Sequence, residues 1–232
     1  MIRAVLFDAT GTLIHLRESV GETYARMARP HGIEIAARHL DAAFSRAFRR
    51  MPPMAFSRVP REHIADLERT WWRELVLATF RDRRAIDRLA DFDRYFDHVF
   101  AYYADPAAWV LAPNTRETLA ELRRSGRRTG IVSNFDYRLG TILDGFGLGP
   151  LLDVVILPSD VGAAKPDPRI FTAAVERLRC EPGDALYVGN DADDDVAGAC
   201  AAGLHAIDVA SLPTLRAVVG RVESLESGVK SR

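Results

Sequence analysis

Short apolar segments alternate with helical patterns along most of this chain, and that alternation constrains the fold more than any other feature. Five runs rich in apolar or β-branched residues are expected to form strands, at 3–7, 128–133, 153–157, 185–189 and 205–209. Helical patterns lie between or after them, at 114–125, 137–146, 168–179, 193–202 and 212–219. Such alternation is typical of βαβ units, so the sequence predicts an α/β fold, a Rossmann-like parallel sheet with helices on both faces.

The segment 17–104 interrupts this alternation. It has no clear strand and shows helical periodicity, for instance in "HLDAAFSRAFRR" and "LERTWWRELVLATF". The stretch "MPPMAFSRVP" at 51–60 divides it, because its three prolines do not fit inside helices. We therefore expect a helical cap domain of residues 17–104, inserted after the first strand of an α/β core domain formed by residues 1–16 and 105–232.

Polar side chains follow four of the expected strands. Asp8 comes directly after the first strand, and Ser133 ends the second. Lys165, one of only two lysines in the chain, follows the third, and the acidic stretch "GNDADDD" at 189–195 follows the fourth. Because the carboxyl ends of parallel strands lie along one edge of a sheet, where ligands bind, we expect these groups to converge on one site.

This combination of side chains suits attack on an anionic centre such as a phosphate. A carboxylate like that of Asp8 approaches a phosphate dianion only where positive charge offsets the repulsion. Lys165 supplies one such charge, and a hard divalent cation held by oxygen ligands would supply more.

The order of these groups also resembles a known family. The motifs "DATGT", "SNF", "KPDPR" and "GNDADDD", which span residues 8 to 195, are similar to four motifs of the haloacid dehalogenase superfamily. Further stretches, such as "SVGETYARMARPHGIE" and "SNFDYRL", resemble its rhythmically-expressed-gene-2-like branch. The resemblance implies a hydrolase of the subfamily with a helical cap, in which the cap selects the substrate.

The resemblance also implies roles for individual residues. Asp8 would be the nucleophile, and Lys165 would neutralise the aspartyl-phosphate intermediate. The implied catalytic residues are Asp8, Thr10, Ser133 and Lys165. The implied substrate-binding residues are Thr12, Ser133, Asn134 and Lys165. The implied Mg²⁺ site comprises Asp8, Thr10 through its backbone carbonyl, Asn190, Asp191 and Asp195, the last expected to hold Lys165 or a metal-bound water.

Thr10 departs from the family pattern. Most phosphatases of the superfamily carry a second aspartate at this position, which protonates the leaving group and later activates water. Threonine does not ionise at neutral pH, and a positioned acid/base contributes roughly 10²–10⁴-fold to a rate. We therefore expect slow hydrolysis of the intermediate and a preference for good leaving groups, such as those of acyl or aryl phosphates.

Asn190 is the second departure, because the family motif has an aspartate there. The spacing from Asn190 to Asp195 fits the motif, but an amide offers a cation only one neutral oxygen. We expect weaker Mg²⁺ binding at this position, with an inward-turned Asp191 as the alternative ligand.

Several of these residues also suit plainer structural roles. Asp8 and Ser133 are favourable helix N-cap residues, and a lysine such as Lys165 is commonly exposed. Asp193 and Asp194 are expected to be solvated at a helix start, where acids suit the helix dipole. For Asp8, Ser133 and Lys165, convergence at strand ends favours the functional interpretation.

Two tryptophans lie side by side in the inserted segment. Trp71 and Trp72 are expected to pack within the helical cap, since large aromatic rings dominate cores. The alternative is that one of the two faces the active-site cleft.

Composition narrows the range of partners. The formal net charge is −1, so no overall field favours nucleic acid or an anionic membrane. No apolar stretch is long enough to span a bilayer, and two cysteines do not make a disulfide framework. We expect a cytoplasmic monomer or homodimer that acts on a small phosphorylated molecule and has no nucleic-acid or membrane partner.

The sequence therefore predicts an Mg²⁺-dependent hydrolase, a phosphatase for small phosphate esters or acyl or aryl phosphates that works through an aspartyl-phosphate intermediate. A metal-free 2-haloacid dehalogenase is one alternative, although Thr10 stands where that branch carries tyrosine. The other alternative is a protein of the same fold that binds a ligand or partner with little or no turnover.

Overall fold

The computed structural model describes residues 1–83, 85–86, 89 and 91–229. Its main sheet has five parallel strands in the spatial order β5-β4-β1-β6-β7. Their bounds are Ala4–Phe7 (β1), Arg128–Val132 (β4), Val154–Ile156 (β5), Ala185–Gly189 (β6) and His205–Asp208 (β7). Each strand lies within one residue of its expected bounds, and the predicted α/β fold is confirmed.

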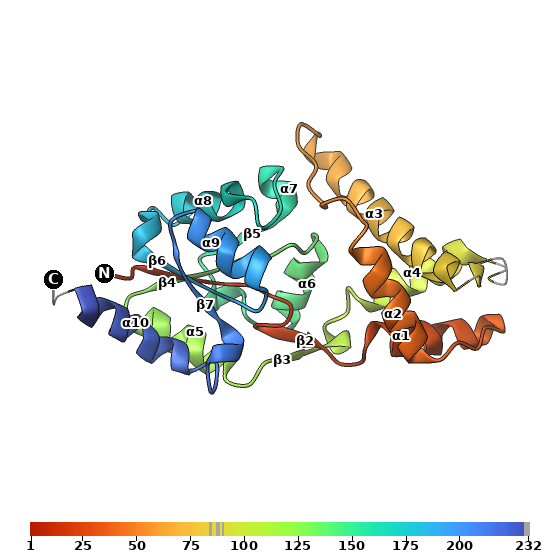
Figure 1. The fold of residues 1–232 in the computed structure, drawn as a ribbon, viewed down its shortest axis with the longest axis horizontal. Coiled ribbons are helices and arrows are strands. Elements are labelled where there is room, and N and C mark those ends of the chain that lie inside the picture. Colours follow the sequence, from red (N-terminus) through yellow and green to blue (C-terminus); the bar gives the residue numbers. More distant parts are fainter. Residues whose placement is uncertain (84, 87–88, 90, 230–232) are drawn as a thin grey trace.

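Helices cover both faces of this sheet (Figure 1). On one face lie α5 (Thr115–Arg124), α6 (Arg138–Gly145) and α10 (Ala217–Val229), and on the other lie α8 (Pro168–Arg177) and α9 (Gly198–Ala201). Strand β1 is fully buried between the two layers. Its side chains alternate, with Val5 and Phe7 in the first hydrophobic cluster and Leu6 in the second, as the two-residue period of a strand requires.

Two expected helices differ from those observed. The pattern at 193–202 begins as a π-helical turn, Ala192–Ala197, before α9. The pattern at 212–219 becomes helix α10, which starts only at Ala217 and runs to Val229. The helix continues because Val218 and Val222 are buried against the sheet and Leu225 packs beside them, one helical turn apart.

Among the described residues between β2 and β3 there are four α-helices, which form the right-hand part of Figure 1. They are α1 (Val20–Ala28), α2 (Ala37–Phe48), α3 (Arg61–Asp82) and α4 (Phe92–Tyr102). Their apolar faces form a separate hydrophobic cluster around Tyr24, Phe80 and Tyr95. The proline-containing stretch 51–60 lies between α2 and α3, as the sequence predicts. No helix in the described part of the chain is both long and apolar enough to cross a bilayer.

A short antiparallel ribbon connects the helical insertion to the core. It consists of β2 (Ile14–Leu16) and β3 (Trp109–Leu111), with His15 opposite Val110. This ribbon is not among the expected strands. Its two short segments lie at the boundaries of the inserted segment, outside the alternation of strand and helix patterns that reveals the main sheet.

Candidate active site

Lys165 lies between two carboxylates at the carboxyl edge of the sheet. Its Nζ is 2.7 Å from Oδ1 of Asp8 and 2.5 Å from Oδ1 of Asp195. The side chains of Lys165, Asp8 and Asp195 are 4%, 8% and 2% exposed. The structure thus brings together three residues that the sequence predicts to converge, and the cluster carries a formal charge of −1.

Burial and neighbouring charges set the protonation of this cluster. Burial alone would lower the pKa of Lys165, but the charges of Asp8 and Asp195 outweigh it and hold that pKa above its ordinary value. Lys165 is therefore an ammonium ion at neutral pH. Burial raises the pKa of Asp8, and the charge of Lys165 opposes that rise.

Tyr187 completes the buried cluster from the middle of β6. Its hydroxyl lies 3.1 Å from Nζ of Lys165, 2.9 Å from Oδ1 of Asp195 and 2.8 Å from the carbonyl oxygen of Val132. Burial raises the pKa of Tyr187 well above its ordinary value, so its hydroxyl stays protonated and can donate. Nothing in the sequence marks Tyr187 as a site residue, because an aromatic side chain in a buried strand is typical of a hydrophobic core.

Asp195 is fixed through both of its oxygens. Oδ1 accepts from Lys165 and lies within hydrogen-bond distance of Tyr187, while Oδ2 accepts the backbone N–H groups of residues 190 and 191 at 2.9 and 3.0 Å. The side chain lies against Gly189, where a Cβ atom would come within 2.4 Å of it. Because both oxygens are occupied, Asp195 is placed to hold Lys165 and not to ligate a metal ion directly.

Asn190 faces the turn that follows Asp8. Oγ1 of Thr12 donates to Oδ1 of Asn190 at 3.2 Å. Gly11 permits this approach, since its φ of 94° is left-handed and a Cβ there would lie 2.6 Å from Oδ1 of Asn190. Thr12 is buried and is not on the wall of the cavity described below, so the structure does not support its predicted contact with substrate.

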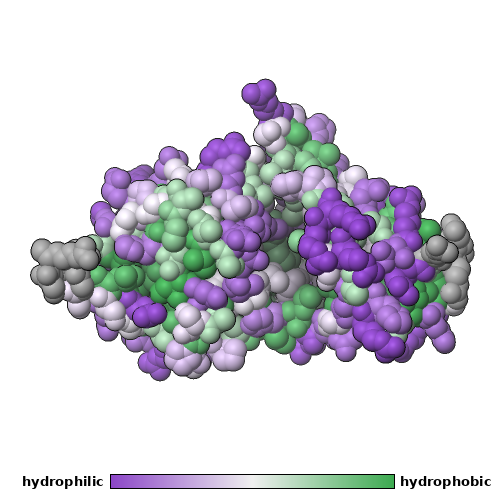
Figure 2. Space-filling model, viewed as in Figure 1, coloured by the Kyte–Doolittle hydropathy of each residue, from purple (hydrophilic) through white to green (hydrophobic). Residues whose placement is uncertain are grey.

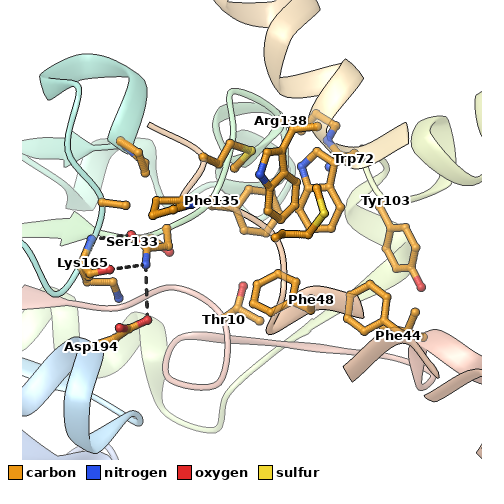
Figure 3. A pocket seen from close by; sticks show the side chains of 18 of the residues that line it. Thr10, Phe44, Phe48, Trp72, Tyr103, Ser133, Phe135, Arg138, Lys165 and Asp194 are labelled. Atoms are coloured by element: carbon orange, nitrogen blue, oxygen red, sulfur yellow. Dashed lines mark hydrogen bonds between the residues drawn. The ribbon is translucent and has the colours of Figure 1, made fainter. Parts of the chain in front are cut away.

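Ser133 and Asn134 follow β4. Nδ2 of Asn134 donates to the carbonyl oxygen of Lys165 at 3.0 Å, and the Lys165 N–H donates back to Oδ1 at 2.8 Å (Figure 3). This exchange fixes the backbone that carries the lysine. Ser133 is buried on the wall of the same cavity as Asp8. Neither Ser133 nor Asp8 is the N-cap of a described helix, which removes the plainer alternative for both.

The acidic stretch places its carboxylates in different environments. Oδ1 of Asp191 accepts the N–H groups of Asp193 and Asp194 at 2.9 and 2.8 Å and so caps the π-helical turn. Asp193 is exposed, as expected. Asp194 is half-buried on the cavity wall (Figure 3), which corrects the expectation that it is solvated. Burial raises the pKa of Asp194, and the charge of Asp191 raises it further.

A cavity of about 720 Å³ lies between the core and the helical insertion, and Figure 2 shows the molecular surface hollowed there. Polar groups gather at one end of it. They belong to Asp8, Thr10, Ser133, Asn134, Lys165, Asn190, Asp191, Asp194 and Asp195. Both Trp71 and Trp72 also line the cavity, so these two rings face the cleft and are not confined to packing inside the insertion.

Two buried contacts join the insertion to the core beside this cavity. Arg138 pairs with Asp136 through Nε and Nη2 at 2.9 and 2.6 Å, and its Nη1 donates to the carbonyl oxygen of Phe100 in α4 at 3.1 Å. Oε2 of Glu68 in α3 accepts the backbone N–H of Tyr137 at 3.0 Å. None of these residues is predicted to have a role, because a charged pair two positions apart in the sequence gives no signal that it is buried.

The parallel sheet, the insertion after the first strand and the buried aspartate–lysine pair at the strand ends together define an α/β hydrolase with a helical insertion. A family model described as haloacid dehalogenase-like hydrolase matches residues 2–203. The chain belongs to the haloacid dehalogenase-like hydrolase family, and it is an enzyme of that superfamily.

Individual relatives indicate the same branch as the sequence motifs. The chain is 35% identical to the mouse haloacid dehalogenase-like hydrolase domain-containing protein 3, over 94% of this chain and 86% of the relative. It is 28% identical to the Rhythmically expressed gene 2 protein of Drosophila melanogaster, over 88% and 81%. The crystal structure of a HAD phosphatase from Thermococcus onnurineus is 28% identical, with a TM-score of 0.59 over 89% of this chain and 86% of that one. The predicted branch is confirmed.

Proposed function

We propose that this hydrolase is a Mg²⁺-dependent phosphatase that forms an aspartyl-phosphate intermediate on Asp8. The observation that carries the proposal is the 2.7 Å contact between Oδ1 of Asp8 and Nζ of Lys165 at the polar end of the cavity. A relative that is 38% identical over 100 residues, 43% of this chain, is named glyceraldehyde 3-phosphate phosphatase, from Methanothermobacter thermautotrophicus. The solved structure from Thermococcus onnurineus is also of a phosphatase.

In the first step, the carboxylate of Asp8 attacks the phosphorus atom of the substrate. Oδ2 is the attacking oxygen, because Oδ1 is held by Lys165. As the new oxygen–phosphorus bond forms, the ester bond breaks and its electron pair leaves with the leaving-group oxygen. Lys165 offsets the negative charge of the transferred phosphoryl group, and the side chains of Ser133 and Asn134 are positioned to hold its oxygens.

In the second step, water attacks the phosphorus atom of the aspartyl phosphate. The bond between phosphorus and Oδ2 breaks, which restores the Asp8 carboxylate, and the released phosphate and solvent take up the protons of the water. Thr10 lies on the cavity wall but has no group that ionises near neutral pH. Leaving groups that depart as stable anions, such as phenolates and carboxylates, are therefore favoured.

The polar end of the cavity fits a divalent cation. Four carboxylates, those of Asp8, Asp191, Asp194 and Asp195, line it together with the single ammonium group of Lys165. Burial is the main cause of the raised pKa of Asp194, and the neighbouring charges of Asp191 and Asp195 add to it. Carboxylate and carbonyl oxygens are the ligands that Mg²⁺ prefers, usually one or two carboxylates with several waters.

The residues that would hold Mg²⁺ are Asp8, Thr10 through its backbone carbonyl, and Asn190 or Asp191. Within the described ranges, no three His, Cys, Asp or Glu side chains are grouped closely enough to hold a metal ion by themselves. The proposed site therefore depends on a backbone carbonyl and on waters to complete the coordination of the ion. Bound there, Mg²⁺ would offset the charge of the phosphate as it approaches Asp8.

We also propose that residues 17–104 act as the cap of a core formed by residues 1–16 and 105–232. This division follows the ribbon of β2 and β3, which connects the two parts. The cap contributes most of the apolar cavity wall and would therefore select the substrate.

Phosphate release from p-nitrophenyl phosphate, with and without Mg²⁺, tests the proposal. We expect Mg²⁺-dependent turnover by the wild type and a loss of about 10³-fold or more in Asp8→Asn, since the nucleophile is gone. Asp193→Asn makes the same chemical change at an exposed position off the cavity wall and should keep the wild-type rate. Equal rates in all three proteins, with and without the ion, would contradict the proposal.

The apolar walls and the Asp8–Lys165 pair also suit the dehalogenase alternative, in which Asp8 displaces a halide from carbon. In that reaction, the other carboxylate side chains of the cavity would have no function. Chloride release from 2-chloropropionate by the metal-free wild type, with no phosphate release from aryl phosphates, would favour this second candidate.

A further inference from the structure

The walls of the cavity away from Lys165 are aromatic. Helix α2 contributes Phe44 and Phe48, helix α3 contributes Trp71 and Trp72, and helix α4 contributes Phe100. Figure 3 shows the rings of Phe44, Phe48 and Trp72 on the side of the cavity opposite Lys165 and Asp194. A volume of about 720 Å³ is far more than a phosphate group needs and is in the range of pockets that take drug-sized ligands.

These rings contact one another but leave apolar surface uncovered. The ring centroids of Trp71 and Trp72 are 5.0 Å apart at an interplanar angle of 79°, and those of Phe48 and Trp71 are 5.9 Å apart at 83°. Phe48 is nevertheless 46% exposed and is one of three large hydrophobic residues so exposed in the described ranges. An apolar ligand in the cavity would cover this surface and gain the free energy of its burial.

Apart from the exposed guanidinium of Arg49, the polar side chains on these apolar walls have few free groups to offer a ligand rich in hydroxyl groups. The guanidinium of Arg138 is taken by Asp136 and the Phe100 carbonyl oxygen, and Nε1 of Trp71 donates to the carbonyl oxygen of Pro52 at 2.8 Å. Nε1 of Trp72 is buried without a hydrogen-bond partner in the described part of the chain. A sugar or polyol bound here would lose hydrogen bonds to water without replacing most of them, which is costly.

We infer that the substrate is an aryl phosphate with a leaving group of more than one aromatic ring, which stacks among Phe48, Trp71 and Trp72 while its phosphate contacts Lys165. The inference rests on the proposed phosphatase function and specifies its substrate class. It also agrees with the lack of an ionisable acid at position 10. A phenolate is stable enough to leave without being protonated, so it does not need the acid that Thr10 cannot supply.

The test compares 2-naphthyl phosphate with phenyl phosphate, whose leaving groups have similar acidity but differ by one ring. We expect kcat/KM to be about tenfold higher for the naphthyl ester, as burial of one more ring predicts. Phe48→Ala should reduce this ratio to about threefold or less. Tyr137→Ala removes a ring with the same exposed fraction, 46%, from outside the cavity wall, and should leave the ratio unchanged.

Binding to the Asp8→Asn variant, measured by calorimetry, separates the substrate class from the chemistry. We expect 2-naphthyl phosphate to bind about tenfold more tightly than phenyl phosphate, and glycerol phosphate to bind more weakly than either. If the variant shows this order but the wild type releases no phosphate, the aryl site stands and the phosphatase proposal fails. If phosphate is released but the two aryl esters are equivalent in binding and turnover, or glycerol phosphate is preferred, the inference about the aryl group is wrong.

Discussion

Oδ1 of Asp8 lies 2.7 Å from Nζ of Lys165, although 157 positions separate these residues in the chain. Both side chains are buried at the carboxyl edge of the parallel sheet, and Asp195 shares the same ammonium group. The arrangement places one nucleophilic carboxylate beside one fixed positive charge. The predictions below follow from that pairing and from the residues around it.

Removing the lysine should destabilise the fold as well as abolish turnover. Lys165→Met leaves the buried carboxylates of Asp8 and Asp195 without their shared counter-ion, which typically costs about 3 kcal/mol or more. We expect a loss of that size in the free energy of unfolding, measured by urea denaturation. The double variant Lys165→Met with Asp195→Asn should recover part of it, because one uncompensated charge is gone.

Arg169→Met provides the comparison for that measurement. Arg169 pairs with Asp167 at 2.7 Å but is 65% exposed, so solvent screens the pair and its loss should leave the free energy of unfolding nearly unchanged. Equal stability of Lys165→Met and the wild type would show that the buried cluster does not depend on the lysine.

Thr10→Asp should accelerate hydrolysis, because it supplies the acid/base that the site lacks. We expect the hydrolysis rate to rise about 10²-fold for an alkyl ester such as glycerol phosphate. The rise should be smaller for phenyl phosphate, whose leaving group depends less on protonation. Thr10→Asn introduces a side chain of the same shape that does not ionise, and it should not accelerate the reaction. An unchanged or lower rate in Thr10→Asp would count against this explanation of the departure.

Asn190→Asp should strengthen Mg²⁺ binding, since it replaces a neutral oxygen with a charged one at the polar end of the cavity. The Mg²⁺ concentration for half-maximal turnover should fall by about tenfold, because affinity for hard cations rises with the charge of the ligands. Thr12 can still donate to the new carboxylate. If only Asp191→Asn changes the Mg²⁺ requirement, Asp191 is the ligand instead.

Glu68→Gln should stabilise the protein at alkaline pH. Burial raises the pKa of Glu68 in the folded state, so the folded protein binds more protons than the unfolded chain and loses stability as pH rises through that raised pKa. Glutamine removes the charge and keeps an oxygen that can accept from Tyr137. We expect the variant to be more stable by roughly 1 kcal/mol at pH 8, with the difference shrinking towards pH 4.

Thermal unfolding at both pH values measures this effect. Glu74→Gln, an exposed change in the middle of the same helix and away from its charged ends, should alter neither profile. A constant difference between Glu68→Gln and the wild type across the pH range would mean that Glu68 acts through packing and not through its charge.

The sheet and the Asp8–Lys165–Asp195 cluster could be predicted because both follow from general rules. Apolar runs mark buried strands, and parallel strands bring their carboxyl ends to one edge whatever their separation in the chain. The ribbon of β2 and β3 was not predicted, because its segments flank the insertion and lie outside the alternation of strand and helix patterns.

The remaining site residues depend on packing that the sequence does not record. Four acids lie within residues 191–195, and no pattern in that stretch distinguishes Asp194, which lines the cavity, from Asp193, which is exposed. Nothing in the sequence distinguishes Arg138 and Glu68 from other charged residues. Their position at the junction of the insertion and the core is visible only in the fold. Trp71 and Trp72 have the same spacing whether they fill a core or line a cleft.

The most direct test of the central claim is to trap the covalent intermediate. The wild type would be mixed with phenyl phosphate and Mg²⁺, quenched within the turnover time and treated with borohydride, which reduces an aspartyl phosphate to a homoserine that peptide mass spectrometry can locate. The account predicts this modification at position 8, dependent on substrate and absent from Asp8→Asn. Phosphate release by the wild type with no modification at Asp8, or with the modification at another residue, would contradict it.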